Sequence, residues 1–206
     1  MAPPSRFSVA SALVLWLSFL VADVSSAGLK EARTGITFPA KSGGGSLTRL
    51  GVRTKGPIKV YAVGLYEGGG AQTFMLKMSY GVGAQKMSSA LSDALKPRIG
   101  DAKLISDFET TLVQGLPDGA PKGTELVFGT GGGKLSLAVN GNKVGSIASK
   151  PLAAAFANIY CDNNAVCEMK PVDDATDESQ AGGLITPKRG AMVGAALGYG
   201  IGKLLS

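Results

Sequence analysis

The chain has 206 residues, 45% of them hydrophobic, so it is long enough for one domain with a substantial core, and wholesale disorder is not expected. Its formal charge of +6 comes from scattered lysines and arginines without a nucleic-acid-binding motif, which favours a basic soluble surface and no nucleic-acid partner. The chain contains no histidine, which excludes His-based triads and His metal sites, and two cysteines alone cannot form a structural zinc site, so we expect no metal and no cofactor.

Residues 1–26 have the pattern of a signal peptide. Arg6 precedes an apolar run over residues 7–22, and small residues follow at 24–27. Asp23 interrupts the run before it reaches the roughly 20 apolar residues of a transmembrane anchor. We therefore predict cleavage near Ser26 or Ala27 and entry into the secretory pathway. The mature protein would then be secreted, stay in the endomembrane lumen, or reach a plastid by the secretory route.

Two strands are predicted after the glycine-rich loop at residues 43–45. Residues 58–66 alternate large apolar side chains with Lys59 and Tyr61, the period of a strand with one buried face. Residues 73–78 show a similar composition and predict a second strand.

Helical spacing replaces this alternation in the middle of the chain. Apolar residues recur every four positions from Met87 to Leu95, which predicts a helix over residues 84–95 that Pro97 ends. A second helix is predicted over residues 104–113, because Gly115 and a proline follow it closely.

The chain then returns to strands at residues 125–128, 134–139 and 143–148. Asn140-Gly141 separates the last two of these strands and predicts a tight hairpin, because both turn residues tolerate positive φ.

A last helix is predicted over residues 151–160, with Leu152, Phe156 and Ile159 on one side. Strands, then helices, then strands, then a helix predict an α+β domain with an antiparallel sheet.

Cys161 and Cys167 follow this helix and leave two alternatives open. In an oxidising lumen the two cysteines could form a disulfide across a short loop, or they could remain separate thiols.

The C-terminal part of the sequence changes composition twice. Residues 173–189 form an acidic, glycine-containing linker, and residues 190–206 form an apolar tail with glycines at 190, 194, 198 and 202. Glycines at this spacing share one face of a helix, as in helices that approach closely in lipid, but the tail is too short to span a bilayer of about 30 Å. We interpret it first as a flexible tail, with peripheral membrane contact or self-association as the alternatives.

Over residues 33–172 the sequence resembles the chalcone isomerase domain family. The resemblance is carried by residues 127–133 leading through the Asn140-Gly141 hairpin to 149–152, by 158–160 and 164–167, by 51–53 with 59–66, and by 116–123. It implies an open-faced sandwich, in which an antiparallel sheet carries a layer of helices on one face and a ligand cleft lies between them.

The same resemblance implies a binding site for the acidic end of a ligand. Arg53 matches the arginine that meets the anionic end of the ligand in the isomerases and the fatty-acid-binding members, and Tyr61 matches its hydroxyl-bearing partner. Because the hairpin is shorter here, Arg49 is a rival for the arginine. A guanidinium stays charged at any relevant pH and can compensate an acid for the water that it loses in an apolar cleft.

The remaining donors of a true isomerase site are not matched. Residues 97–100 and Leu104 fall opposite a tyrosine and an asparagine of the isomerases, and Ile159 falls opposite a hydroxyl-bearing residue, so that only the adjacent Asn158 could substitute. Such donors carry much of an enzyme's rate, so the pattern favours binding over catalysis and resembles the non-catalytic, fatty-acid-binding branch.

Three functions follow as hypotheses. The first is the binding of a fatty acid or a similar small amphipathic acid. The second is an intramolecular lyase that isomerises a chalcone to a flavanone, with a flavonoid-like ligand. The third is a membrane-associated interaction protein whose domain is only a scaffold.

Overall fold

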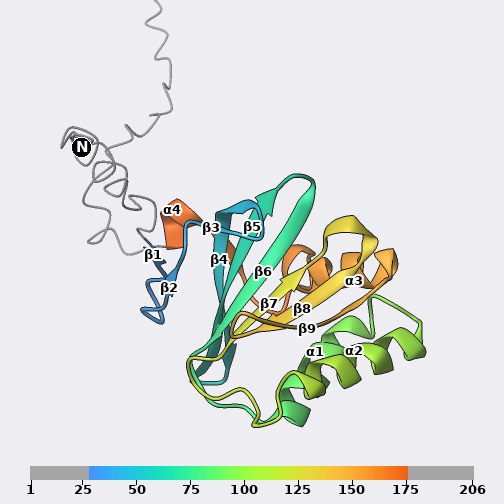
Figure 1. Ribbon diagram of the computed structural model, residues 1–206. Helices are drawn as coiled ribbons and strands as arrows, with labels where there is room; N and C mark the ends of the chain where they lie inside the picture. The colour runs from blue at the N-terminus through green and yellow to red at the C-terminus, as the bar shows by residue number, and fades with distance from the viewer. Residues whose placement is uncertain (1–27, 176–206) are drawn as a thin grey trace, which may run out of the picture.

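The computed structural model describes residues 28–175 (Figure 1). The predicted signal peptide, the apolar tail and most of the linker lie outside these residues, so they stay predictions. Within residues 28–175, no helix is both long and apolar enough to cross a membrane.

An eight-stranded antiparallel sheet forms the centre of the described domain. Seven strands lie in the order β10-β4-β5-β6-β7-β8-β9, and β3 pairs with β4 beside this path. The strands are β3 (Lys41–Ser42), β4 (Gly45–Lys55), β5 (Ile58–Gly68), β6 (Ala71–Met78), β7 (Glu125–Gly129), β8 (Leu135–Val139), β9 (Asn142–Ile147) and β10 (Met169–Pro171).

Two turns of this sheet lie where the sequence predicted them. Asn140 and Gly141 join β8 to β9 with φ of 49° and 81°, which confirms the predicted hairpin. The predicted loop at residues 43–45 is a turn between β3 and β4, in which Gly43 and Gly44 adopt positive φ. The sequence pattern alone did not predict β3, β10 or the long strand β4.

Three helices cover one face of the sheet (Figure 1): α1 (Ala84–Leu95), α2 (Ala102–Gln114) and α3 (Lys150–Cys161). All three were predicted, but α2 begins two residues early because the Asp101 carboxylate accepts the backbone N–H groups of Lys103 and Leu104. The Ser149 hydroxyl caps α3 in the same way. A short 3₁₀ turn, η2 (Gly131–Gly133), precedes β8, and α4 (Val172–Ala175) follows β10.

The main hydrophobic core lies between the sheet and these helices. Its centre is a cluster of buried aromatic rings from β6, β7, α2 and α3: Phe74, Phe108, Phe128, Phe156 and Tyr160. Because α3 presents Leu152, Phe156 and Ile159 to this core, the predicted apolar side of the last helix is confirmed.

The opposite face of the sheet is partly covered too. A two-stranded hairpin of β1 (Leu29–Lys30) and β2 (Thr37–Phe38) places the buried Phe38 against it. Phe38 fits there because a Cβ on Gly64 of β5 would lie 2.9 Å from the Phe38 ring. The domain is therefore the predicted α+β open-faced sandwich, with a small second layer that was not predicted.

Candidate functional site

The pairing of β4 with β5 brings together the two residues named first from the sequence. Arg53 lies directly opposite Tyr61 in this antiparallel pair, so both side chains belong to the same face of the sheet. That face is the one under the helices, because Tyr61 is part of the main core. The structure therefore places Arg53 and Tyr61 side by side at one margin of this core.

A second tyrosine, Tyr160, completes the group from the last turn of α3. The hydroxyl oxygens of Tyr61 and Tyr160 lie 3.2 Å apart, and both residues are buried. One hydroxyl of the pair donates this hydrogen bond, and the proton of the other has no acceptor among the described residues. The pair can therefore donate one more hydrogen bond to a group that enters beside it.

Sequence reasoning missed Tyr160, although a signal for it was present. Leu152, Phe156 and Tyr160 recur every four residues, which places all three on the buried side of α3. The residue proposed as a substitute donor, Asn158, is instead exposed, because it lies on the other side of the same helix. The polar group that α3 places next to Tyr61 is thus the hydroxyl of Tyr160, not the amide of Asn158.

Arg53 is exposed at the margin of the core, with its charge available. Its Nη1 donates to the backbone carbonyl oxygen of Val166 at 2.5 Å, which holds the guanidinium on this side of the sheet. Within residues 28–175, no carboxylate lies within salt-bridge distance of Arg53. A positive charge without an acidic partner is thus placed near two buried phenols.

Burial keeps these phenols neutral. Desolvation is the main reason why the pKa of Tyr61 and that of Tyr160 lie well above the usual value, and the charge of Arg53 opposes this rise only in part. Both groups therefore keep their protons at physiological pH. They can donate hydrogen bonds to an anion rather than acting as anions themselves.

Arg49, the rival candidate, lies on the same face but has other neighbours. It pairs with Leu65 on β5, four residues along β4 from Arg53. Hydrogen bonds from Gln72 and Thr48 lower the pKa of Glu67, and the charge of Arg49 adds to this effect. The charge of Arg53, by contrast, acts on the pKa of both Tyr61 and Tyr160, so Arg53 is the arginine next to the tyrosine pair.

Close packing around Gly51 brings the segment after α3 to Arg53. A Cβ at Gly51 would lie 2.6 Å from the Sδ of Met169 and 3.2 Å from the Sγ of Cys167. Only a glycine therefore lets this segment approach β4 so closely. The approach places Cys167 and the carbonyl of Val166 next to Arg53.

The two cysteines are free thiols in this structure. Cys161 is exposed and Cys167 is buried, and burial raises the pKa of Cys167 to about 12. A disulfide between them stays a prediction for an oxidising compartment.

An ion pair fixes the loop that carries Val166. The Arg98 guanidinium, after α1, donates to both carboxylate oxygens of Asp162 at 2.9 and 2.8 Å and to the carbonyl of Asn164 at 2.8 Å. The hydrogen bonds from Arg98 lower the pKa of the Asp162 carboxyl below its ordinary value. Arg98 lies in the segment 97–100, where an isomerase tyrosine was sought, and its role here is to hold this loop.

We expect the replacement Asp162→Asn to destabilise the protein at neutral pH but not in strong acid. A carboxyl whose folded pKa is lowered contributes stability above its ordinary pKa of 3.8, and this contribution is lost as the pH falls through the lowered value. Chemical unfolding of both proteins between neutral pH and about pH 2 measures the effect. The matched control is Asp93→Asn, which removes the exposed pair with Lys96 and is expected to change little. A gap between wild type and Asp162→Asn that stays constant down to the lowest pH would contradict this expectation.

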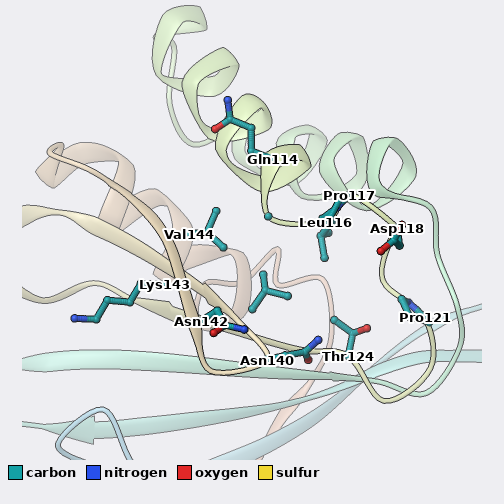
Figure 2. A pocket seen from close by; sticks show the side chains of 13 residues that line it. Gln114, Leu116, Pro117, Asp118, Pro121, Thr124, Asn140, Asn142, Lys143 and Val144 are labelled. Carbon is teal, nitrogen blue, oxygen red and sulfur yellow. The ribbon is translucent and has the colours of Figure 1, made fainter.

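Among the pockets of the described domain are three that lie elsewhere, and none of these three is lined by Arg53, Tyr61 or Tyr160. One, of about 470 Å³, lies between the end of α2 and the β8–β9 hairpin and is lined by groups such as Leu116, Asn140 and Asn142 (Figure 2). Another, of about 590 Å³, lies over β7, β8 and β9. The third lies at the start of β5.

Comparison with known proteins relates the chain to a solved structure. No model of a protein family matches the sequence, and no curated protein matches it. The crystal structure of a fatty-acid binding protein of Arabidopsis thaliana matches with a TM-score of 0.58 and 21% sequence identity, over 72% of this chain and 93% of that one. The likeness shows that the two proteins share a fold, the chalcone-isomerase-like open-faced sandwich expected from the sequence.

Proposed function

We propose that this chain, which has the chalcone-isomerase-like fold, binds a fatty acid or a similar small amphipathic acid with its carboxylate at Arg53. The observation that carries this proposal is the position of Arg53 beside the buried Tyr61–Tyr160 hydroxyl pair. The structural likeness to a fatty-acid binding protein supports the same ligand class.

Arg53 and the hydroxyls of Tyr61 and Tyr160 suit a carboxylate in charge and in hydrogen bonding. Arg53 has no acidic partner among the described residues, so a ligand carboxylate can take that place. The tyrosine pair has one free donor, and its protons remain in place at neutral pH. A carboxylate that loses water on entry would recover one charge-assisted contact and one further hydrogen bond.

The ligand tail would enter the main core beside Tyr160. Phe74 stacks on Tyr160 with ring centroids 5.3 Å apart, and Met78 on β6 is buried nearby in the same core. Because this region is filled by side chains, a bound tail has to displace some of them, and α3 with the loop after it is the element that covers the site. Burying the tail would contribute about 0.8 kcal/mol per methylene.

Titration of the purified protein with dodecanoate tests the proposal, with calorimetry as the readout. The control ligand is dodecanol, which has the same chain without a charge. We expect dodecanoate to bind at least about tenfold more tightly, because a hydrogen bond to a charged group contributes about 1.5–3 kcal/mol. Equal binding of the two ligands, or no binding of either, would overturn the carboxylate anchor.

A chalcone substrate separates binding from catalysis in the same preparation. If the chain is only a binder, the enone absorbance of an added chalcone stays constant over the time of the titration. Rapid loss of this absorbance, dependent on Arg53, would instead support the intramolecular lyase, for which the two tyrosine hydroxyls would be the available proton donors.

A further inference from the structure

The third pocket is a basic one at the end of the sheet where β5 begins. It has a volume of about 520 Å³, and its lining combines four cationic residues with no aspartate or glutamate. The cationic residues are Arg33 from the β1–β2 turn, Lys59 from β5, Lys77 from β6 and Lys122 from the loop before β7.

Most of this charge is not neutralised within residues 28–175. Only Lys77 has an acidic partner, with its Nζ 3.2 Å from an oxygen of Glu125. Lys59 donates to the backbone carbonyl of Arg33, which fixes its ammonium at the pocket without cancelling its charge. The side chains of Arg33 and Lys122 are exposed, and neither forms an ion pair with a carboxylate among the described residues.

The same pocket is lined by two large apolar residues that reach solvent. Ile58 is 42% exposed and Tyr80 is 54% exposed, and the other large hydrophobic residues in the described part of the chain are buried or half-buried. Both side chains thus line a pocket that also carries four cationic residues, so apolar and positive groups share one surface.

We propose that this surface, the Ile58–Tyr80 face (Arg33, Ile58, Lys59, Tyr80 and Lys122), docks on an anionic lipid bilayer. A bilayer surface combines negative head groups with apolar chains just beneath them, which is the complement of cations that surround exposed apolar side chains. Tyrosine is suited to such a boundary because its ring is apolar and its hydroxyl stays in contact with water. A soluble anion without an apolar part would neutralise the cations but would leave Ile58 exposed to water.

The position of the face fits a protein that takes an acid from a membrane. Ile58 and Lys59 follow the turn between β4 and β5, and Arg53 lies just before this turn. Docking would therefore bring the candidate anchor close to the bilayer, in which fatty acids dissolve. This argument alone rests on the proposed function, whereas charge and exposure carry the docking proposal without it.

An environment-sensitive fluorophore at position 58 tests the docking on the full chain. The label is attached to an Ile58→Cys variant that also carries Cys161→Ser, because Cys161 is an exposed thiol and Cys167 is buried. The control places the same label on α2 through Lys103→Cys in the same background. With phosphatidylcholine vesicles containing about 30 mol% phosphatidylserine, we expect a blue shift at position 58 and none at position 103. No shift at position 58, or equal shifts at both positions, would overturn the proposal.

Charge replacement then measures the contribution of the face. Sedimentation with the same vesicles is compared for the wild type and for Arg33→Gln, Lys59→Gln and Lys122→Gln combined. We expect about a fivefold loss of partitioning per cation and about a 100-fold loss for all three.

A control triple of equal charge change is placed away from the face: Lys96→Gln, Lys103→Gln and Lys150→Gln. It is expected to lose less than about threefold, because charges beyond a Debye length of the bilayer contribute little. If both triple variants lost partitioning equally, binding would depend on net charge alone, and the proposal that the Ile58–Tyr80 face docks would be wrong. Dodecanoate titration of the face triple in solution should match the wild type, so a failure of acid binding and a failure of docking are observed separately.

Discussion

Replacing Arg53 with glutamine is expected to weaken dodecanoate binding by about 10- to 100-fold, the loss of a charge-assisted contact worth about 1.5–3 kcal/mol. Arg53 faces the tyrosine pair across the β4–β5 ladder, and no carboxylate of the described residues neutralises it. Calorimetric titration with dodecanoate measures the loss. Dodecanol binding should not change, because the alcohol makes no use of the positive charge.

Two further variants separate position from charge. Arg49→Gln removes the same charge four residues away on β4 and is expected to bind dodecanoate as the wild type does. Arg53→Lys keeps the charge but loses the planar fork of donors, so an intermediate affinity is expected. If Arg49→Gln lost affinity while Arg53→Gln kept it, the anchor would be assigned to Arg49. Because Arg53 is exposed, thermal unfolding should show that none of the three variants is strongly destabilised.

The replacement Phe156→Ala is expected to cost about 3–5 kcal/mol of unfolding free energy, the range for a large aromatic removed from a core. Phe156 is fully buried, and its ring centre lies 4.3 Å from that of Phe128 and 5.8 Å from that of Phe74. It therefore joins α3 to two strands of the sheet. Since small proteins have about 5–15 kcal/mol of stability in total, this single change is expected to bring the domain close to unfolding.

Chemical unfolding measures this cost, with Ile58→Ala as the matched control. Ile58 is 42% exposed, so its truncation is expected to change the unfolding free energy by no more than about 0.5 kcal/mol. A cost below about 1 kcal/mol for Phe156→Ala would mean that neighbouring rings refill the space. In that case the main core would be plastic enough to admit a ligand tail without movement of α3.

Helices and central strands were predictable because their apolar residues repeat with a clear period. α1, α2 and α3 follow the four-residue spacing, and β5, β6, β7 and β8 follow alternation or short apolar runs. The strand β4 was not predicted from its pattern, because Gly51 and the polar side chains around it interrupt the alternation. Glycine there serves the close approach of Cys167 and Met169, a contact between residues more than 100 positions apart.

In the candidate site, too, some residues could be predicted from the sequence and one could not. Arg53 and Tyr61 could be named from the family resemblance, and the pairing of β4 with β5 brings them together. Tyr160 could not be assigned a role from the alignment, because a shift of one or two residues on a helix turns a side chain from the core to solvent. Asn158 and Tyr160 are two residues apart, and only the second reaches Tyr61.

The four cations of the basic pocket come from four separate segments of the chain, so no local sequence pattern could predict this pocket.

The sequence by itself determined the order of the elements from β5 to α3, the tight hairpin at Asn140-Gly141 and the class of fold, because these depend on local periodicity and turn chemistry. Only the tertiary structure decided which groups come together: the hydroxyl of Tyr160 with that of Tyr61, the guanidinium of Arg53 with the backbone carbonyl of Val166, and Ile58 and Tyr80 as lining of one pocket. The physical reason is that such meetings depend on strand register and helix rotation, which long-range packing selects.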